Sequence, residues 1–176
     1  MKNTKGSENF WFKALAILVL MAGTFLFFKE NYFQNKGWEF HREAAKQEYL
    51  KGNLAEAERY LLKALEDAEK FEAGDPRLHG TLNSLLSIYS QQSKLKESEK
   101  IILKMLALDE QLLGADHPNV GASWNNLAEN YRSQALDEKA KVAYEKAIKI
   151  FEKRFGPDHA LVAQIRDRYK SHLQKD

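Results

Sequence analysis

Aspartate–histidine pairs are the residues of this chain whose type and spacing first suggest chemistry. Asp116-His117 and Asp158-His159 lie 42 residues apart, and a histidine beside a carboxylate can bind a metal or move a proton. Two such pairs on neighbouring helix pairs would be separated by about 10 Å, too far to share a zinc ion with bonds of about 2 Å. Each pair suits a helix start better, because Asp and His side chains can accept hydrogen bonds from free amides.

Other catalytic chemistries lack their residues. The chain has no cysteine, which excludes thiolate catalysis and zinc or iron–sulfur sites held by cysteine. It has neither of the two common glycine-rich nucleotide loops, and no serine–histidine–acid grouping or glycosidase carboxylate pair stands out. The remaining carboxylates are spread among lysines, as on solvated helix faces. The sequence therefore predicts a protein that is not an enzyme and holds no cofactor or metal.

The charge balance argues against nucleic acid as a partner. The whole chain has 27 basic and 25 acidic residues. Residues 1–28 hold three lysines and one glutamate, which leaves 24 basic and 24 acidic residues in the remainder. A balanced domain has no overall attraction for a phosphate backbone, so we expect a protein partner and no nucleic acid.

An apolar stretch near the N-terminus predicts a membrane anchor. Residues 14–28 contain no charge, and with residues 10–13 the stretch reaches nineteen residues, or about 28 Å of helix against about 30 Å of hydrocarbon. Trp11, Tyr32 and Phe33 stand where interfacial aromatics are expected. We predict a transmembrane helix with its interfacial flank over 10–33, after a short head over 1–9. A cleaved signal peptide is the alternative, although the apolar run continues past Ala22 and Gly23.

The orientation of the anchor is less strongly marked. Its flanking basic residues are nearly balanced between the two sides: Lys2, Lys5 and Lys13 before it, and Lys29, Lys36 and Arg42 after it. The short head and free amino terminus favour an N-terminus in the cytoplasm. The expected localisation is a single-pass membrane protein with its larger domain outside the cytoplasm, in the periplasm or an equivalent space.

The rest of the chain repeats at an interval of 42 residues. Phe71, Leu113 and Phe155 open three similar stretches that begin FEAGDPRLHG, LGADHPNVGA and FGPDHALVAQ. Tyr89 and Tyr131 show the same interval, and a first unit fits with a slip of one residue. Apolar residues within the units recur at spacings of three and four, which predicts helices. A unit of this kind cannot cover its apolar face alone, so it stacks on its copies.

We therefore predict an all-α fold: three helix-turn-helix repeats over 38–163 that form a short superhelix. The units run over about 38–78, 79–120 and 121–163, and a capping helix over 160–174 closes the stack. Small and aromatic residues are expected to pack the repeats against each other: Ala57, Ala64, Tyr89, Trp124, Leu127, Ala128, Tyr131, Ala140, Tyr144 and Ala147.

The stretch that starts WNNLAENYRSQALDEKAKVAYEKAIKIF at Trp124 resembles a tetratricopeptide repeat. It is similar to the longer 42-residue variety found in kinesin light chains. The resemblance implies that the first helix of each unit lines an inner groove, where asparagines bond the backbone of an extended peptide. Asparagine is unfavourable inside a helix, so its recurrence at the same position of two units needs a reason, and peptide binding would be one. The positions that this implies for the groove are Arg42, Lys46, Asn83, Ser87, Asn125, Asn126, Glu129 and Arg132.

These features predict a membrane-anchored protein–protein interaction module, a scaffold or assembly factor whose groove binds a segment of a partner. Two other functions stay open at this point. The protein could be a chaperone-like helper for membrane or secreted proteins, or a structural subunit of a membrane complex that buries its outer helix faces. Three repeats offer a small groove, so self-association that extends the stack is a further alternative.

Overall fold

The protein is a row of α-helices, as expected from the sequence. The computed structural model describes residues 5–72 and 74–173, except for the side chains of 5–16, 27, 28, 30, 31, 34, 172 and 173. Seven helices lie in these residues: α1 (Lys5–Leu50), α2 (Leu54–Ala68), α3 (Pro76–Gln91), α4 (Leu95–Leu113), α5 (Pro118–Ser133), α6 (Asp137–Phe155) and α7 (Ala160–Leu173).

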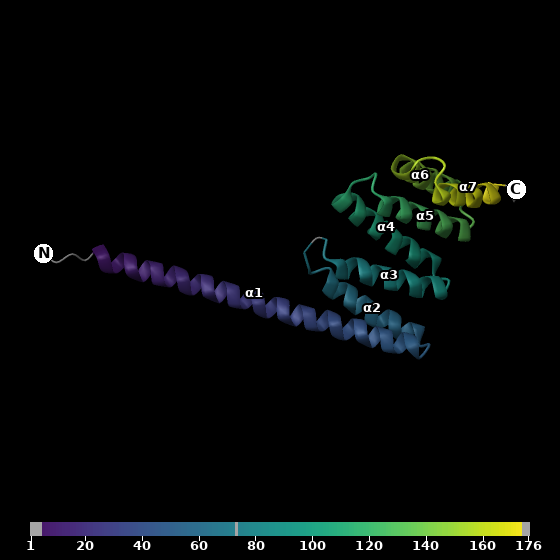
Figure 1. Ribbon diagram of the computed structural model, residues 1–176. Helices are drawn as coiled ribbons and strands as arrows, with labels where there is room; N and C mark the ends of the chain where they lie inside the picture. Colours follow the sequence, from purple (N-terminus) through teal and green to yellow (C-terminus); the bar gives the residue numbers. More distant parts are fainter. Residues whose placement is uncertain (1–4, 73, 174–176) are drawn as a thin grey trace.

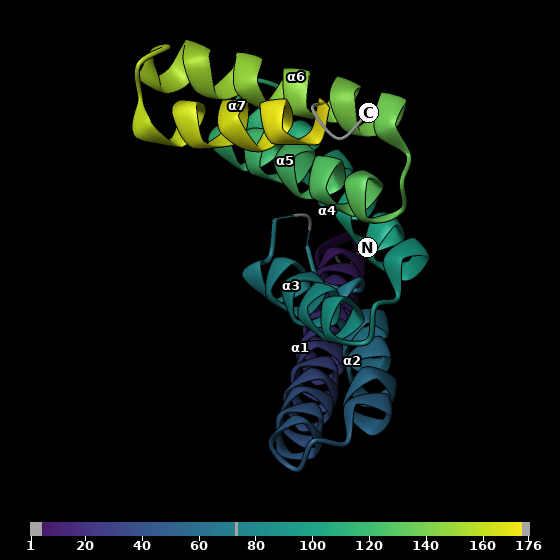
Figure 2. The same cartoon turned by 90° about the vertical axis from the view of Figure 1, so that its right-hand side faces the viewer.

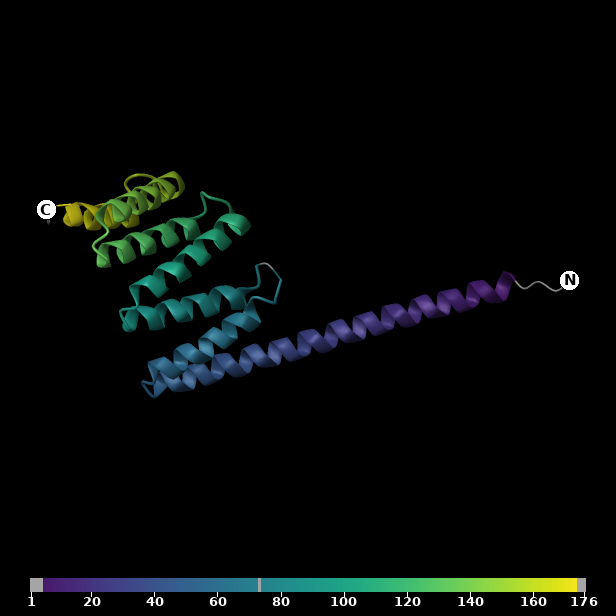
Figure 3. The ribbon, with the colours of Figure 1, turned by 180° about the vertical axis from the view of Figure 1, so that it is seen from behind.

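Each helix packs mainly on its neighbours in sequence, from α1 with α2 to α6 with α7. Figure 1 shows the resulting stack, with the first part of α1 extending away from it, and Figure 3 shows the same arrangement from behind. In Figure 2, α6 and α7 lie across the direction of α1, so the stack twists from one end to the other. The predicted all-α fold of serially packed helix pairs is confirmed.

The turn inside each pair contains one residue with left-handed backbone, at Gly52 (φ 79°), Ser93 (φ 55°) and Ala135 (φ 56°). This conformation ends a helix and lets a later amide reach back to an unpaired carbonyl. The amide-to-carbonyl bonds that do so are alike, each 2.9 Å long: Asn53 to Glu48, Lys94 to Tyr89, and Leu136 to Tyr131. The three turns therefore have the same geometry, although their residues differ.

The loop between units combines a glycine with a helix cap. Gly114 (φ 86°, ψ 155°) and Gly156 (φ 90°, ψ 157°) adopt a conformation that is open essentially to glycine alone. The Nδ1 atom of His117 then accepts the amide of Asn119 at 3.2 Å, ahead of Pro118 in the first helical turn. The corresponding atom of His159 accepts the amide of Leu161 at 3.2 Å. Both histidines cap helices, as the sequence predicted.

The apolar core continues from one unit to the next through α4. Ile101 and Met105 of α4 join a cluster with residues of α1, α2 and α3, whereas Ile102 joins a second cluster with residues of α5, α6 and α7. Leu86 of α3 packs against both clusters. Since one helix contributes to two cores, the two halves of the stack are expected to be mechanically coupled.

The residues predicted to pack the repeats are placed in two ways. Trp124 and Tyr131 are only partly buried, and Lys146 and Lys139 lie over their rings, with Nζ 3.9 Å and 5.3 Å from the respective ring centroids. The others are buried between helices: Ala57, Ala64, Tyr89, Leu127, Ala128, Ala140, Tyr144 and Ala147.

A single helix, α1, runs through the region where the sequence suggested two elements. An anchor ending near Phe33 and a repeat helix beginning at Trp38 were expected to be separate, but α1 continues from Lys5 to Leu50 without a break. Gly37 lies inside it, where a Cβ atom would be only 3.0 Å from the carboxylate of Asp67. Glycine at this position lets α2 approach α1 closely, and the helix continues past it.

Polar contacts fasten this part of α1 to the repeats. The indole Nε1 of Trp38 donates to the hydroxyl of Thr81 at 3.0 Å. The imidazole of His41 lies 2.9 Å from the carboxylate of Asp67. Because both bonds join α1 to helices of the repeats, the C-terminal part of α1 belongs to the first repeat.

Among the described residues, no helix combines the length and the apolar composition that a membrane crossing requires. The expected span over residues 10–33 falls partly on side chains outside the described set, and so does the short head over residues 1–9.

Candidate protein-binding groove

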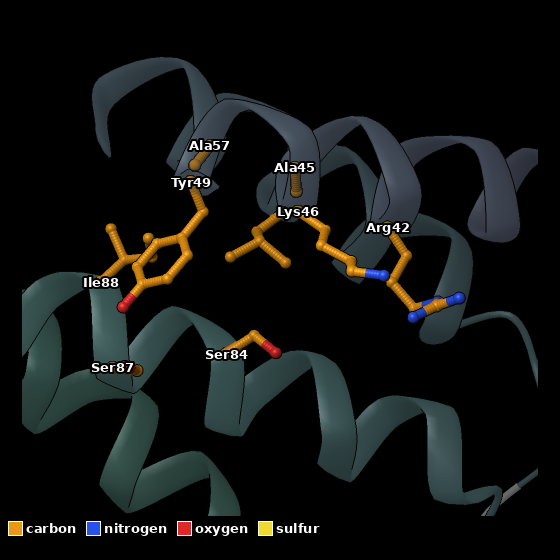
Figure 4. A pocket seen from close by; sticks show the side chains of 9 residues that line it. Arg42, Ala45, Lys46, Tyr49, Ala57, Ser84, Ser87 and Ile88 are labelled. Atoms are coloured by element: carbon orange, nitrogen blue, oxygen red, sulfur yellow. The ribbon is translucent and has the colours of Figure 1, made fainter. Parts of the chain in front are cut away.

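Two hollows lie along the first helices of the units, at opposite ends of the stack. We define the first hollow as the space of about 350 Å³ between α1, α2 and α3. Figure 4 shows it, with the side chains of α1 facing those of α3. Its residues come from all three helices: Arg42, Ala45, Lys46, Tyr49, Ala57, Leu61, Ser84, Ser87 and Ile88.

The floor of the first hollow is apolar and its rim is cationic. Ala57, Leu61 and Ile88 are buried residues of the neighbouring core. Arg42 and Lys46 stand on one side of α1, with half or more of their side-chain surface exposed. Such a combination can hold an apolar side chain next to a carboxylate.

The cations of the rim are only weakly held by the protein. Glu43 lies 3.9 Å from Arg42 and 3.8 Å from Lys46, and all three side chains are well exposed. A hydrogen bond from Gln47 and the charge of Lys46 lower the pKa of Glu43, so this carboxylate is ionised at neutral pH. Exposed pairs of this kind contribute little to stability, because water and salt screen them. A ligand carboxylate can therefore compete for either cation.

Hydroxyl groups complete the polar part of the first hollow. The hydroxyl oxygen of Tyr49 accepts a hydrogen bond from the side-chain amide of Gln91 at 3.1 Å. The hydroxyl hydrogen of Tyr49 remains available to donate. Ser84 donates to the carbonyl of Gly80 at 2.9 Å, which leaves its oxygen to accept. The hollow thus offers both a donor and an acceptor to a peptide backbone.

The second hollow is the space of about 340 Å³ between α5, α6 and α7. It is built from aromatic, aliphatic and amide side chains and has no charged residue in its lining. The Oδ1 atom of Asn125 is buried there, without a hydrogen-bond partner among the described residues. A buried acceptor left unpaired costs about 1–3 kcal/mol. Its lining residues are Pro118, Asn119, Ala122, Asn125, Asn126, Phe151, Phe155, Leu161 and Ile165.

The residues expected in the groove divide between these places. Arg42, Lys46 and Ser87 meet in the first hollow, and Asn125 and Asn126 meet in the second. No single site gathers all five, because the hollows lie on different helices.

Three further candidates lie outside both hollows. Asn83 is exposed on α3, outside the lining of the first hollow. Glu129 accepts the hydroxyl of Tyr144 at 2.8 Å and pairs with Arg132 at 2.9 Å. Burial, followed by this bond to Glu129, raises the pKa of Tyr144 to about 12. Glu129 therefore helps to pack α5 on α6 and is not free to meet a ligand.

Sequence reasoning missed several residues that line the hollows. Tyr49 follows Arg42 by seven residues and Lys46 by three, so helical spacing alone could have placed it on the same face. Ser84 and Leu61 had no such signal, because their approach to α1 depends on the crossing of three helices. Phe155 and Leu161 meet across the loop before α7, which no local pattern specifies.

Comparison with known proteins agrees with this geometry. Residues 78–153 match the family model described as tetratricopeptide repeat. Over these residues the chain is similar to tetratricopeptide repeats. A search of the curated proteins finds no match to it.

Several solved structures are similar in fold to this chain. BtubC (BKLC) from P. vanneervenii aligns with a TM-score of 0.63 and 18% identity, over 82% of this chain and 64% of that chain. A structure described as a kinesin light chain with nearly identical TPR-like repeats, from Podosopora anserina, aligns with a TM-score of 0.60 and 19% identity, over 77% and 65%. The chain spans less than two thirds of each of these structures, and identities this low show the fold alone.

Tetratricopeptide repeats are protein-binding units and are typically not catalytic. The two hollows fit this role, since they offer apolar floors with polar edges.

Proposed function

We propose that this protein is a membrane-anchored scaffold or assembly factor that binds an extended segment of a partner along its first helices. The observation that carries the proposal is the first hollow, where Arg42 and Lys46 stand beside an apolar floor. Charged residues that only meet water need no apolar surface beside them. A bound segment would use both the cations and the apolar floor.

The chemistry of the first hollow favours an acidic segment that also carries an aliphatic side chain. The carboxylate would pair with Arg42 or Lys46, and the aliphatic group would cover Leu61. Tyr49 and Ser84 would bond the backbone, and Asn125 and Asn126 would bond it at the other end of the stack. A charge-assisted hydrogen bond contributes about 1.5–3 kcal/mol, so the cations carry most of the specificity in this proposal.

The proposed anchor is the N-terminal part of α1. Ile17, Leu18, Val19 and Leu20 follow each other on this helix, and each keeps more than half of its surface exposed. Four consecutive residues point to all sides of a helix, so this segment has no polar side to leave in water. A helix that is apolar all round is normally covered on all sides, as it would be in a bilayer.

Peptide binding to the full chain in lipid nanodiscs tests the groove. The probes are labelled peptides that differ only in glutamate against glutamine, read by fluorescence anisotropy. We expect Arg42→Gln with Lys46→Gln to weaken the acidic peptide at least about tenfold, from the loss of one or two charge-assisted bonds. Lys63→Gln with Lys100→Gln is the matched control, since both lysines are exposed outside the two hollows.

Unchanged affinity in the Arg42 and Lys46 variant would remove the first hollow as the binding site. Unchanged affinity in Asn83→Ala with Asn125→Ala would remove the asparagines from the groove.

The anchor and its orientation need separate tests. Resistance of the full chain to alkaline carbonate, with release by detergent, supports an integral anchor, and release by carbonate contradicts it. We propose that the repeats lie outside the cytoplasm. A reporter fused after Asp176 that is active only outside the cytoplasm supports this orientation, and activity of a cytoplasmic reporter opposes it.

A further inference from the structure

One side of α1 carries alternating lysine and phenylalanine residues that the repeats leave uncovered. From the position of this stripe, we infer that α1 leaves the membrane at a tilt and rests Lys29, Phe33, Lys36 and Phe40 in the headgroup layer of an anionic bilayer. The inference rests on the anchor proposed above. It extends the lipid contact beyond the anchor, through Lys36 and Phe40, and it sets the direction in which the repeats are held.

The four residues follow each other at spacings of four, three and four, so they lie on one side of the helix. Phe33 and Phe40 keep 61% and 64% of their surface exposed, and both lysines are exposed as well. We call Lys29, Phe33, Lys36 and Phe40 the outer stripe.

The outer stripe faces away from the repeats. Trp38 and Ala45 pack toward α2 and α3 on the opposite side of α1. Helical geometry places them about half a turn from the outer stripe. In Figure 1 the stack rises from one side of α1 and leaves the other side uncovered.

The distance along the helix allows a bilayer to reach the outer stripe. If the anchor ends at Phe33, Lys29 lies about 6 Å before that end and can extend its ammonium group toward the headgroups. Lys36 lies about 4–5 Å and Phe40 about 10 Å beyond that end, at about 1.5 Å per residue. The headgroup layer is about 5–8 Å deep on each side of the hydrocarbon. Transmembrane helices tilt by up to about 40°, which brings Phe40 closer to the surface when the outer stripe is on the lower side.

The residue types match a lipid interface better than they match a protein surface. Lysine stems can follow apolar surroundings while the ammonium groups meet lipid phosphates, and aromatic rings favour the interfacial layer. Lys36 lies 3.9 Å from the carboxylate of Glu39, and both side chains are well exposed. That pair is weak, so it leaves Lys36 able to bind a phosphate.

This arrangement has a consequence for the first hollow. Because the outer stripe lies on the side of α1 opposite α3, tilting it toward the bilayer turns α3 away from the bilayer. The first hollow, which lies between those helices, would then stay open to a partner.

Single cysteines provide the test, since the chain has none of its own. Phe40→Cys reports on the outer stripe, Leu20→Cys on the anchor, and Leu50→Cys is the control on the same helix, with 69% of its surface exposed. Each full-length variant receives a nitroxide label in vesicles of phosphatidylcholine with phosphatidylglycerol. Collision with oxygen and with a water-soluble nickel chelate then gives the depth of the label.

We expect the label in Phe40→Cys to lose nickel contact relative to the label in Leu50→Cys, and the label in Leu20→Cys to lie in the hydrocarbon. Pure phosphatidylcholine, or Lys29→Gln with Lys36→Gln, should return the label in Phe40→Cys to water. A label in Phe40→Cys that is fully aqueous while that in Leu20→Cys is in hydrocarbon overturns the lipid contact and keeps the anchor. An aqueous label in Leu20→Cys overturns the anchor itself.

Shielding at Phe40→Cys that is equal in both lipids and unaffected by the lysine changes would also contradict the inference. It would assign the outer stripe to a protein contact.

Discussion

The second and third repeats place different residues in the same framework. Leu85 and Leu127 are 42 residues apart and are both almost fully buried. Asp109 and Phe151 are also 42 residues apart and buried, but one is a carboxylate bound to a histidine and the other an aromatic ring in the core. The comparison teaches that this fold requires a filled position between helices, while the chemistry that fills it can change.

The ends of the stack differ in a similar way. At the C-terminal end, α7 buries Val162 and Ile165 against α6 and leaves Asp167 and Arg168 exposed. At the other end, α1 leaves Phe40 exposed. A polar outer face is what the last unit of a solenoid needs in water, so the apolar end requires another cover, which the proposed lipid contact would supply.

The largest effect should come from the position that the two repeats share. Leu85→Ala and Leu127→Ala should each lower the free energy of unfolding by about 2–5 kcal/mol, since each removes a fully buried side chain. Urea unfolding followed by circular dichroism measures both. Because α4 joins the two cores, each variant should keep a single transition. Two separate transitions would show that the halves of the stack are independent.

A smaller effect on the free energy of unfolding, dependent on pH, is expected at Asp109, where the second repeat differs from the third. Burial raises the pKa of Asp109, although His79 and His117 act in the opposite direction. The folded protein then binds this proton more tightly than the unfolded chain, so protonation adds stability. That stability is present below the ordinary aspartate pKa of about 3.9 and is lost as pH rises through the folded pKa.

Asp109→Asn should remove this loss while keeping an acceptor for the Nε2 atom of His79, which lies 2.6 Å from Asp109. Urea titrations at a series of pH values from about 4 to 7 compare the variant with the parent. A parent whose slope matches that of Asp109→Asn would contradict the raised pKa. Phe151→Leu serves as the control in the third repeat, because it changes no ionisable group.

The smallest effect should appear in the turns. Ala135 and Gly52 share a left-handed backbone, which costs roughly 1 kcal/mol for a residue with a Cβ atom. Gly52→Ala should therefore destabilise the protein by up to about 1 kcal/mol, and Ala135→Gly should be neutral or slightly stabilising, since glycine also gains freedom in the unfolded chain. Thermal unfolding distinguishes them, and equal shifts of the same sign would contradict the common turn geometry.

Much of the local structure could be read from the chain. The histidine caps and the burial of Leu127 and Tyr144 follow from signals within a few residues or from the repeat interval. The candidate site was less readable. Arg42, Lys46 and Ser87 were chosen by helical phase and do line one hollow, whereas Glu129 was chosen in the same way and pairs with Arg132 and Tyr144. The helical phase of a residue predicts the direction of its side chain but not which other residue it contacts.

The sequence by itself determined that this protein is a row of helix pairs, because a repeated apolar pattern is hidden only by stacking its copies. It also determined where the loops between units fall, through glycine, proline and capping residues. Only the tertiary structure decided that α1 is one helix from Lys5 to Leu50 and that Leu61 and Ser84 meet Arg42 across three helices. Such contacts depend on the angles at which helices cross, and those angles are set by the sum of many side chains, so no short segment encodes them.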